Sequence, residues 1–178
     1  LCFWALGLNT SDVFQGNRLV EFGDWIGVPV SGKTSMEDGT SFGFEIGDRC
    51  IYMENLARIR RRSLWDQHAE DHDGIPWAVV ERVARGMQEF KVAHHVHDYT
   101  DMLTMFARSD WRASLEVLFV DEAQDLSLLQ WEVVDKLARG CRRVVIAGDD
   151  DQAIYRWAGA AVEHFRDLSG RVRVLGQS

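Results

Sequence analysis

Two acidic turns carry the residues whose types suit phosphoryl transfer. In the first, LFVDEAQD, a hydrophobic run ends in the adjacent acids Asp121 and Glu122. A carboxylate at the end of a strand can bind Mg²⁺ directly or through water, and a second carboxylate beside it can deprotonate an attacking water. The simpler interpretation is that Asp121 only caps the helix that follows. This turn alone does not decide between the two interpretations.

The second acidic turn, GDDDQAIYRWAGA, begins at Gly148 and follows the next hydrophobic run. Gln152 is placed to contact a γ-phosphate, as a glutamine that senses water or phosphate does in other nucleotide hydrolases. Two such turns after neighbouring strands are hard to explain as helix caps alone. Together they predict a site for Mg²⁺ and a nucleoside triphosphate.

Short strands that alternate with helices are the elements expected to position these turns. The apolar, β-branched runs at 116–120, 142–147 and 172–175 are separated by helical patterns. This alternation predicts an α/β fold with a parallel sheet buried on both faces. Ligands bind at the carboxyl ends of the strands in such sheets, and both acidic turns fall at that edge.

The first half of the chain has a different character. Residues 1–8 are apolar and predict the start of a buried helix, whereas residues 9–97 are polar and Gly-rich at first. Helices are then predicted over 51–65 and 77–91, the second opened by Pro76. A further amphipathic helix, YTDMLTMFA, leads to the first acidic strand.

Residues 27–34 read GVPVSGKT and fit the phosphate-loop pattern G-x-x-x-x-G-K-[ST]. A working phosphate loop needs a strand before it and a helix that begins at the Lys-Ser/Thr pair. The preceding VEFGDWI instead has helical spacing, two glycines follow the match, and Pro29 removes a backbone donor. We interpret the match as a coincidence, with Lys33 solvated on a surface turn.

The composition excludes several other classes of protein. No apolar run in the 178 residues approaches the roughly 18 residues that a membrane span needs. The three scattered cysteines form no C-x-x-C pair and no disulfide framework, so a reducing cytoplasm is the simplest compartment. A net charge of −8 argues against bulk attraction to nucleic acid but leaves room for a local basic groove.

One local basic cluster and two histidine clusters stand out. The arginines are open to two interpretations, contact with the phosphates of duplex DNA or a solvated helix face. HAEDHD does not have the H-E-x-x-H order of a zinc site, and the second histidine cluster has no cysteine nearby. The basic cluster comprises Arg49, Arg58, Arg60, Arg61 and Arg62, and the histidines are His68, His72, His94, His95 and His97.

VDEAQD followed by GDDDQAIYRWAGA resembles motifs II and III of the superfamily 1 DNA helicases of the UvrD/Rep type, and most of all their bacterial and phage-type members. LCFWALGL is similar to the segment after their T-x-H-S element, HDYTDML to the helix before motif II, and LGQS to the run before the motif IV arginine. The resemblance implies a partial RecA-like motor lobe at 1–8 and 98–178. It places a mainly helical, 1B-like insertion at 9–97. The Walker A segment of this P-loop NTPase fold would precede Leu1.

The resemblance also implies roles for single residues. Asp121 would ligate Mg²⁺, Glu122 would be the catalytic base, and Gln152 would sense the γ-phosphate of ATP. Tyr155 and Trp157 would stack on bases of single-stranded DNA; the alternative is that these rings pack in the core. Many members carry an arginine at the position of Ala158, a side chain that this sequence lacks. The other residues expected at the nucleotide site are Gln124, Asp125, Gly148 and Asp149.

The implied function is ATP-dependent translocation on single-stranded DNA from 3′ to 5′ with unwinding of duplex junctions. We expect the chain to be part of a longer protein that supplies a second RecA-like lobe, and to be inactive by itself. One alternative is a DNA-binding or regulatory module that keeps the fold but uses no nucleotide. Another is the helicase part of a nuclease–helicase of DNA repair. The sequence does not identify the pathway.

Overall fold

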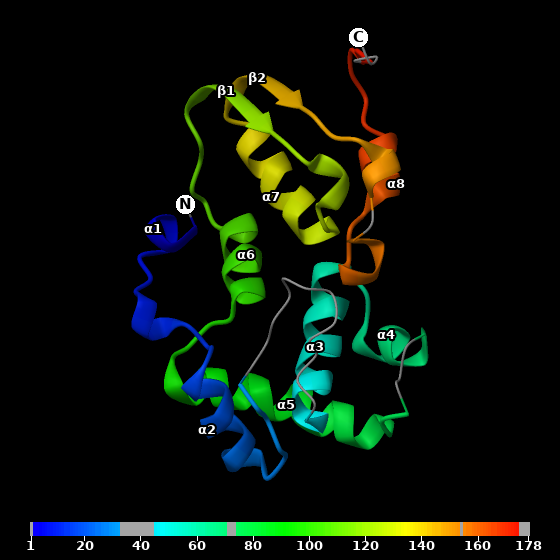
Figure 1. Ribbon diagram of the computed structural model, residues 1–178. Coiled ribbons are helices and arrows are strands. Elements are labelled where there is room, and N and C mark those ends of the chain that lie inside the picture. The colour runs from blue at the N-terminus through cyan, green and yellow to red at the C-terminus, as the bar shows by residue number, and fades with distance from the viewer. Residues whose placement is uncertain (1, 33–44, 71–73, 154, 175–178) are drawn as a thin grey trace.

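The computed structural model describes residues 2–32, 45–70, 74–153 and 155–174. They form a helical unit and an α/β unit, which lie end to end with α6 (Tyr99–Arg108) between them (Figure 1). The helical unit contains α2 (Asn17–Ile26), α3 (Ile46–Ile59), α4 (Leu64–Glu70) and α5 (Trp77–His94). The α/β unit contains β1 (Leu115–Val120), α7 (Leu128–Ala138), β2 (Cys141–Ile146) and α8 (Val162–Arg166).

The core of the helical unit is aromatic. Phe14, Phe22 and Phe90 meet with ring centroids 5.6–5.7 Å apart, in the edge-on and tilted arrangements that aromatic pairs favour. Val80 and Val83 of α5 are fully buried in the same core. Burial of these side chains holds α2, α3 and α5 together.

The segment that matches the phosphate-loop pattern follows a helix. As predicted, VEFGDWI is helical within α2, which ends where Gly27 takes a left-handed conformation with φ of 65°. The interpretation of the next residues as a surface turn is wrong, because Val28 and Val30 are buried in the aromatic core. Lys33 and Thr34 lie outside the described residues.

The helix predicted over 51–65 is two helices, α3 and α4. The chain turns at Arg61, whose φ of 55° is in the left-handed region. Ser63 then caps α4, because its hydroxyl accepts a hydrogen bond from the Asp66 N–H (3.0 Å). Arginine is not a typical residue for a left-handed turn, so the break could not be predicted from residue types. In contrast, α5 begins at Trp77, directly after Pro76, as predicted.

A buried ion network joins α3 and α5 to the start of α6. Lys91, only 4% exposed, donates to Asp98 (2.8 Å) and Asp101 (2.7 Å). Arg58 donates to the same two carboxylates (2.5 and 2.7 Å) and to Glu54 (2.9 Å). Burial alone would raise the pKa of the Asp98 carboxyl, but Arg58 and Lys91 outweigh burial and lower it. The pKa of Glu54 is raised, because burial is the larger effect there.

The chain enters the helical unit and leaves it at one place. The Phe14 N–H donates to the carbonyl oxygen of His97 (2.8 Å), and the His97 N–H donates to that of Asp12 (2.7 Å). These bonds form a parallel bridge between Val13 and His97. Asp98 then caps α6 by accepting a hydrogen bond from the Asp101 N–H (2.7 Å). The two crossings, at which the chain enters and leaves the helical unit, therefore lie side by side.

The sheet of the described residues has two parallel strands, β1 and β2, joined by α7. Leu115 lies opposite Cys141 and Val120 opposite Ile146, which confirms two of the three predicted strands. Residues 171–174 are not a strand. They run away from the sheet (Figure 1), and no strand of the described residues pairs with them. Leu175 lies outside the described residues.

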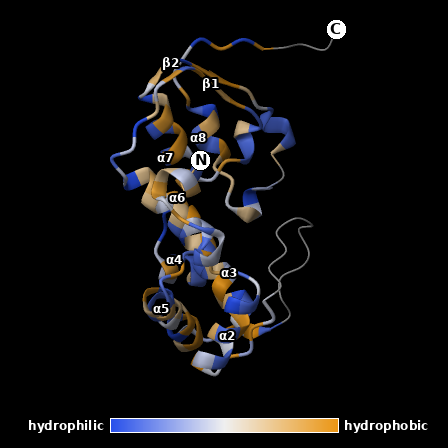
Figure 2. Ribbon diagram, turned by 90° about the vertical axis from the view of Figure 1, so that its left-hand side faces the viewer, coloured by the Kyte–Doolittle hydropathy of each residue, from blue (hydrophilic) through white to orange (hydrophobic). Residues whose placement is uncertain are grey.

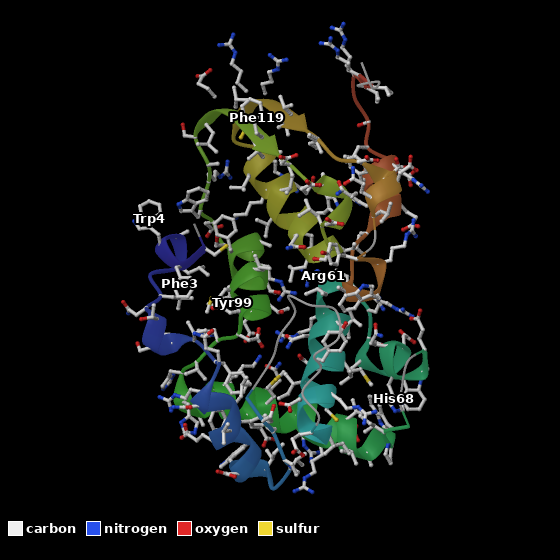
Figure 3. The ribbon with its side chains drawn as sticks, viewed as in Figure 1. Phe3, Trp4, Arg61, His68, Tyr99 and Phe119 are labelled. Carbon is white, nitrogen blue, oxygen red and sulfur yellow. The ribbon has the colours of Figure 1, made fainter. Side chains whose placement is uncertain are left out.

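The prediction that the sheet is buried on both faces is wrong for the described part of the chain. Leu115, Val117 and Phe119 alternate along β1 and are exposed. Figure 3 shows Phe119 at the outer end of the molecule, and Figure 2 shows β1 mostly in the hydrophobic colour. The physical reason is that α7 covers only one face. None of the described helices is long and apolar enough to cross a membrane.

Residues 1–8 were expected to begin a buried helix, but α1 (Cys2–Leu6) has no buried residue. It packs against α6 at the side of the molecule (Figure 1). Trp4 is strongly exposed and projects outward at the side of the molecule (Figure 3). The apolar composition of this segment therefore predicted the helix correctly and its burial wrongly.

Candidate nucleotide site and strand-binding loop

The two acidic turns meet at the carboxyl ends of β1 and β2. Backbone pairing continues beyond the strands, since the Ala147 N–H donates to Val120 (2.8 Å) and the Ala123 N–H donates to Ala147 (3.0 Å). The first turn is η2 (Ala123–Asp125), and the second is η3 (Asp150–Gln152). Parallel strands thus bring the two predicted turns to one edge of the sheet.

Gln124 joins one turn to the other. Its side chain is buried, with 1% exposed. Its Nε2 donates to the Glu122 carboxylate (2.7 Å), and its Oε1 accepts a hydrogen bond from the Asp149 N–H (3.0 Å). A Cβ atom at Gly148 would lie 2.6 Å from this Oε1, so the bridge requires glycine there. The sequence placed Gln124 at the site but did not predict that it spans the turns.

Asp121 and Glu122 present their carboxylates to solvent at this edge. The Glu122 N–H donates to Asp121 Oδ1 (3.0 Å), and Glu122 has a φ of 49°, an uncommon conformation for a residue with a side chain. No Lys, Arg or His of the described chain forms an ion pair with either carboxylate. The edge therefore carries negative charge that no cation of the described residues neutralises.

The second turn is organised around Asp149. Its carboxylate accepts hydrogen bonds from the Asp151 N–H (3.1 Å) and from Nε2 of Gln152 (2.6 Å). Arg166 of α8 pairs with Asp150 (2.7 Å). A continuous series of hydrogen bonds thus connects Gln152 through Asp149 and Gln124 to Glu122.

Asp125 lies behind the exposed acids. Burial raises the pKa of its carboxyl, and the nearby Glu122 adds to this effect. One of its oxygens, Oδ2, is 3.4 Å from Nε2 of Gln124, whereas Oδ1 is buried without a hydrogen-bond partner. Asp125 therefore lies inside the turn, with Gln124 between it and the exposed edge.

The chemistry of Asp121 suits Mg²⁺. Mg²⁺ usually keeps several waters and binds one or two carboxylates together with the phosphates of its substrate. A single exposed carboxylate at a strand end fits that role. No group of three or more His, Cys, Asp or Glu residues in the described chain is arranged to hold a metal ion by itself.

The histidine clusters make structural contacts. Nε2 of His68 lies 2.8 Å from the carbonyl oxygen of Ile75, and its ring packs against Trp77. His94 stacks on Phe90 with ring centroids 4.0 Å apart. The backbone of His97 forms the bridge to Val13. His72 lies outside the described residues.

Tyr155 and Trp157 belong to η4 (Tyr155–Ala158) and are 42% and 39% exposed, so their rings are not buried in the core. Their centroids are 6.4 Å apart. We call η4 and the Gly159 that follows it the aromatic loop. Gly159 has a φ of 102°, and a Cβ atom there would lie 2.8 Å from Ile59 of α3. The loop is therefore in close contact with the helical unit.

The four clustered arginines predicted to bind DNA form contacts within the chain. Arg58 belongs to the buried ion network, which commits its guanidinium to carboxylates. Arg61 pairs with Glu132 of α7, and Figure 3 shows it where α3 meets the α/β unit. Arg62 pairs with Glu70, and Arg60 donates to the aromatic loop. Neither a solvated helix face nor a row of free phosphate contacts describes the whole cluster, because Arg58, Arg60 and Arg61 also bind groups that are distant in sequence.

Comparison with known proteins shows the family of this chain. The family described as UvrD/REP helicase N-terminal domain matches residues 51–173, more than half of the chain. The chain therefore belongs to this family. The match includes both acidic turns and the aromatic loop, and it begins within α3.

Curated relatives carry related names. The ATP-dependent DNA helicase Rep of Escherichia coli K12 is 40% identical over 62 residues, which are 35% of this chain and 9% of that protein. Rep of Buchnera aphidicola subsp. Acyrthosiphon pisum is 42% identical over 102 residues, 46% of this chain and 16% of the relative. DNA helicase II of E. coli K12 is 41% identical over 56 residues, 32% of this chain and 8% of the relative. The chain thus spans less than a fifth of each of these proteins.

Proposed function

We propose that the chain is part of the motor of an ATP-dependent DNA helicase and that ATP binds at the edge formed by the two acidic turns. The observation that carries this proposal is the Gln124 bridge, which fixes Glu122 and the turn of Gln152 on neighbouring strands. Family membership and the names of the relatives support it. In this proposal the sheet with its helices is a partial RecA-like lobe, formed by residues 1–8 and 98–178.

Residues 9–97 form the 1B-like insertion of this proposal. The side-by-side crossings at Val13 and His97 support it, because an inserted unit leaves and rejoins its host at one place. The expected partners are single-stranded DNA, a duplex junction and a second RecA-like lobe of the same protein, which we place in the cytoplasm.

The edge suits hydrolysis of a phosphoanhydride. Asp121 would hold Mg²⁺, which when bound offsets negative charge on the phosphates. Glu122 accepts the proton of the attacking water, and the amide of Gln124 holds the Glu122 carboxylate in place for this step. Gln152 contacts the γ-phosphate, while Gly148 and Asp149 shape the loop around it. Asp125 packs beneath Gln124.

The aromatic loop provides the contact with DNA. Tyr155 and Trp157 expose ring faces on which bases of a single strand stack, at about 1–3 kcal/mol per base and with little regard to sequence. The loop follows Gln152 closely in the chain. A change at the γ-phosphate therefore has a short route to the stacked bases, and we propose that this route couples hydrolysis to movement from 3′ to 5′.

The test is the rate of ATP hydrolysis by the full-length protein that contains this chain, measured with and without single-stranded DNA. We expect Glu122→Gln to lower kcat by at least about a hundredfold, because it removes the general base. Glu116→Gln is the matched control, since Glu116 lies on β1, the strand that leads to Glu122, and is strongly exposed. Equal kcat values for the Glu122→Gln and unmodified proteins would refute the assigned base. Strand binding without any ATP hydrolysis in the unmodified protein would favour the nucleotide-independent module.

A further inference from the structure

We propose that Arg60 is a positioning residue for DNA binding: it fixes the backbone of the aromatic loop and does not contact a phosphate itself. This inference rests on the proposed stacking of bases on Tyr155 and Trp157. It assigns Arg60, on the helical unit, a part in a site that lies on the α/β unit.

Arg60 holds two successive carbonyl groups. Its Nη2 donates to the carbonyl oxygens of Arg156 (2.9 Å) and Trp157 (3.1 Å). The Arg156 carbonyl also accepts a hydrogen bond from the Gly159 N–H within the loop (3.1 Å), so Arg60 adds a second donor there. Carbonyl groups at the end of a helical turn commonly take such outside donors. Because one nitrogen bonds both oxygens, the peptide groups on either side of the Trp157 Cα atom are held together. The direction of the indole side chain follows from that backbone.

A second contact, on the side away from the aromatic loop, holds the guanidinium of Arg60 in place. Its Nη1 donates to Oε1 of Gln67 (3.1 Å), and Gln67 is only 1% exposed within α4. A buried amide on one side and two carbonyl groups on the other leave the guanidinium little freedom to turn toward a passing strand. The rigid fork of donors suits this double role, whereas a lysine ammonium has no such fork.

Other contacts of α3 act on the same loop. The Tyr52 hydroxyl donates to the carbonyl oxygen of Trp157 (3.4 Å), and Ile59 lies against Gly159. Arg60 is thus the charged member of a contact between α3 and the aromatic loop. A shift of the helical unit relative to the sheet would move the two rings, so Arg60 links the position of one unit to strand binding by the other.

The experiment measures binding of a dye-labelled oligothymidine to the full-length protein by fluorescence anisotropy over a series of salt concentrations. Arg60→Gln is expected to weaken binding about tenfold, the usual effect of losing a hydrogen bond to a charged group, with the slope of log K against log salt unchanged. Arg60→Lys, which keeps the charge, is expected to restore little of the loss. Arg85→Gln is the charge control, because Arg85 is exposed on α5 and pairs with Glu89 of the same helix (4.0 Å).

A second arm combines Arg60→Gln with Trp157→Ala. If Arg60 acts through the loop, its substitution adds little once the indole is gone, so the two effects are not additive. Additive effects, full rescue by lysine, or a slope reduced by about 0.7 would each show a direct phosphate contact and overturn the inference. Trp157→Ala alone distinguishes a failure of the proposed stacking from a failure of the proposed role of Arg60. Unchanged binding by that variant would refute the proposed stacking, whereas weak binding by it beside normal binding by Arg60→Gln would refute the role of Arg60 only.

Discussion

Carboxylates gather in two regions of this molecule, and the two sets differ in what lies beside them. In the ion network, Asp98, Asp101 and Glu54 are largely buried and each is paired with Arg58, Lys91 or both. At the edge of the sheet, Asp121 and Glu122 are exposed and have no cation partner in the described chain. The same kind of side chain is therefore paired with a cation in one region and unpaired in the other.

This difference indicates that the buried carboxylates stabilise the fold, whereas the exposed carboxylates are available to bind a ligand. A buried carboxylate needs a paired cation, because the cost of removing its charge from water is otherwise not offset. An exposed pair of carboxylates needs no such partner and repels its neighbours mildly, so its charge remains free to attract a cation from solution. We infer that the network fixes the start of α6 on the helical unit, whereas the exposed edge is free for the proposed binding of Mg²⁺ with its nucleotide.

The largest effect on stability is expected in the network. Arg58→Leu leaves three carboxylates with Lys91 as their only cation in the network, so we expect the free energy of unfolding to fall by about 3–5 kcal/mol. Urea denaturation followed by tryptophan fluorescence measures this loss. Asp121→Asn is the comparison from the edge and should change the free energy by no more than about 0.5 kcal/mol. Similar losses for both variants would remove the distinction between the two regions.

An intermediate effect is expected at Gln124, whose buried side chain supports the exposed edge. Gln124→Leu keeps the approximate volume but leaves the Asp149 N–H and the Glu122 carboxylate without their partner. We expect a loss of about 1–3 kcal/mol in stability and a lower kcat for ATP hydrolysis in the full-length protein. Gln88→Leu, on the exposed face of α5, is the control. A normal kcat for Gln124→Leu would show that the bridge does not serve the reaction.

The smallest effect is a dependence on pH. The pKa of Asp98 is lowered from its ordinary 3.8, so its ionised form stabilises the folded chain fully above pH 3.8, and this stabilisation is lost as the pH falls through the lower folded value. Glu54, whose pKa is raised, acts in the opposite sense. Urea midpoints measured between pH 7 and pH 3 should therefore fall less steeply for Asp98→Asn than for the unmodified chain. Parallel curves would contradict the assignment.

The sequence predicted the elements that depend on local pattern. Strands β1 and β2 follow from their β-branched runs, and α5 follows from Pro76 and the helical spacing after it. The meeting of the two acidic turns follows from parallel strands, because their carboxyl ends share an edge. The roles of Asp121, Glu122 and Gln152 in catalysis remain predictions.

Features that depend on distant partners were not predictable in the same way. The sequence alone indicates a basic patch at the arginine cluster. In the structure, Arg61 pairs with Glu132, and Arg60 donates to carbonyl groups of the aromatic loop, and both partners lie far along the chain. The break between α3 and α4 at Arg61 lacks a glycine or another residue typical of a left-handed turn. The exposed face of β1 could not be predicted either, because an apolar run does not indicate whether helices cover one face of the strand or both.

Because the crossings at Val13 and His97 are adjacent, the helical unit could be deleted from the protein by design. Because their backbones are hydrogen-bonded neighbours, a bridge of a few glycines could replace everything between them without stretching the host. Asp98 and Asp101 would then lose Lys91 and Arg58, so such a deletion should also convert both acids to asparagine. The same junction would accept a foreign module grafted in place of the native one.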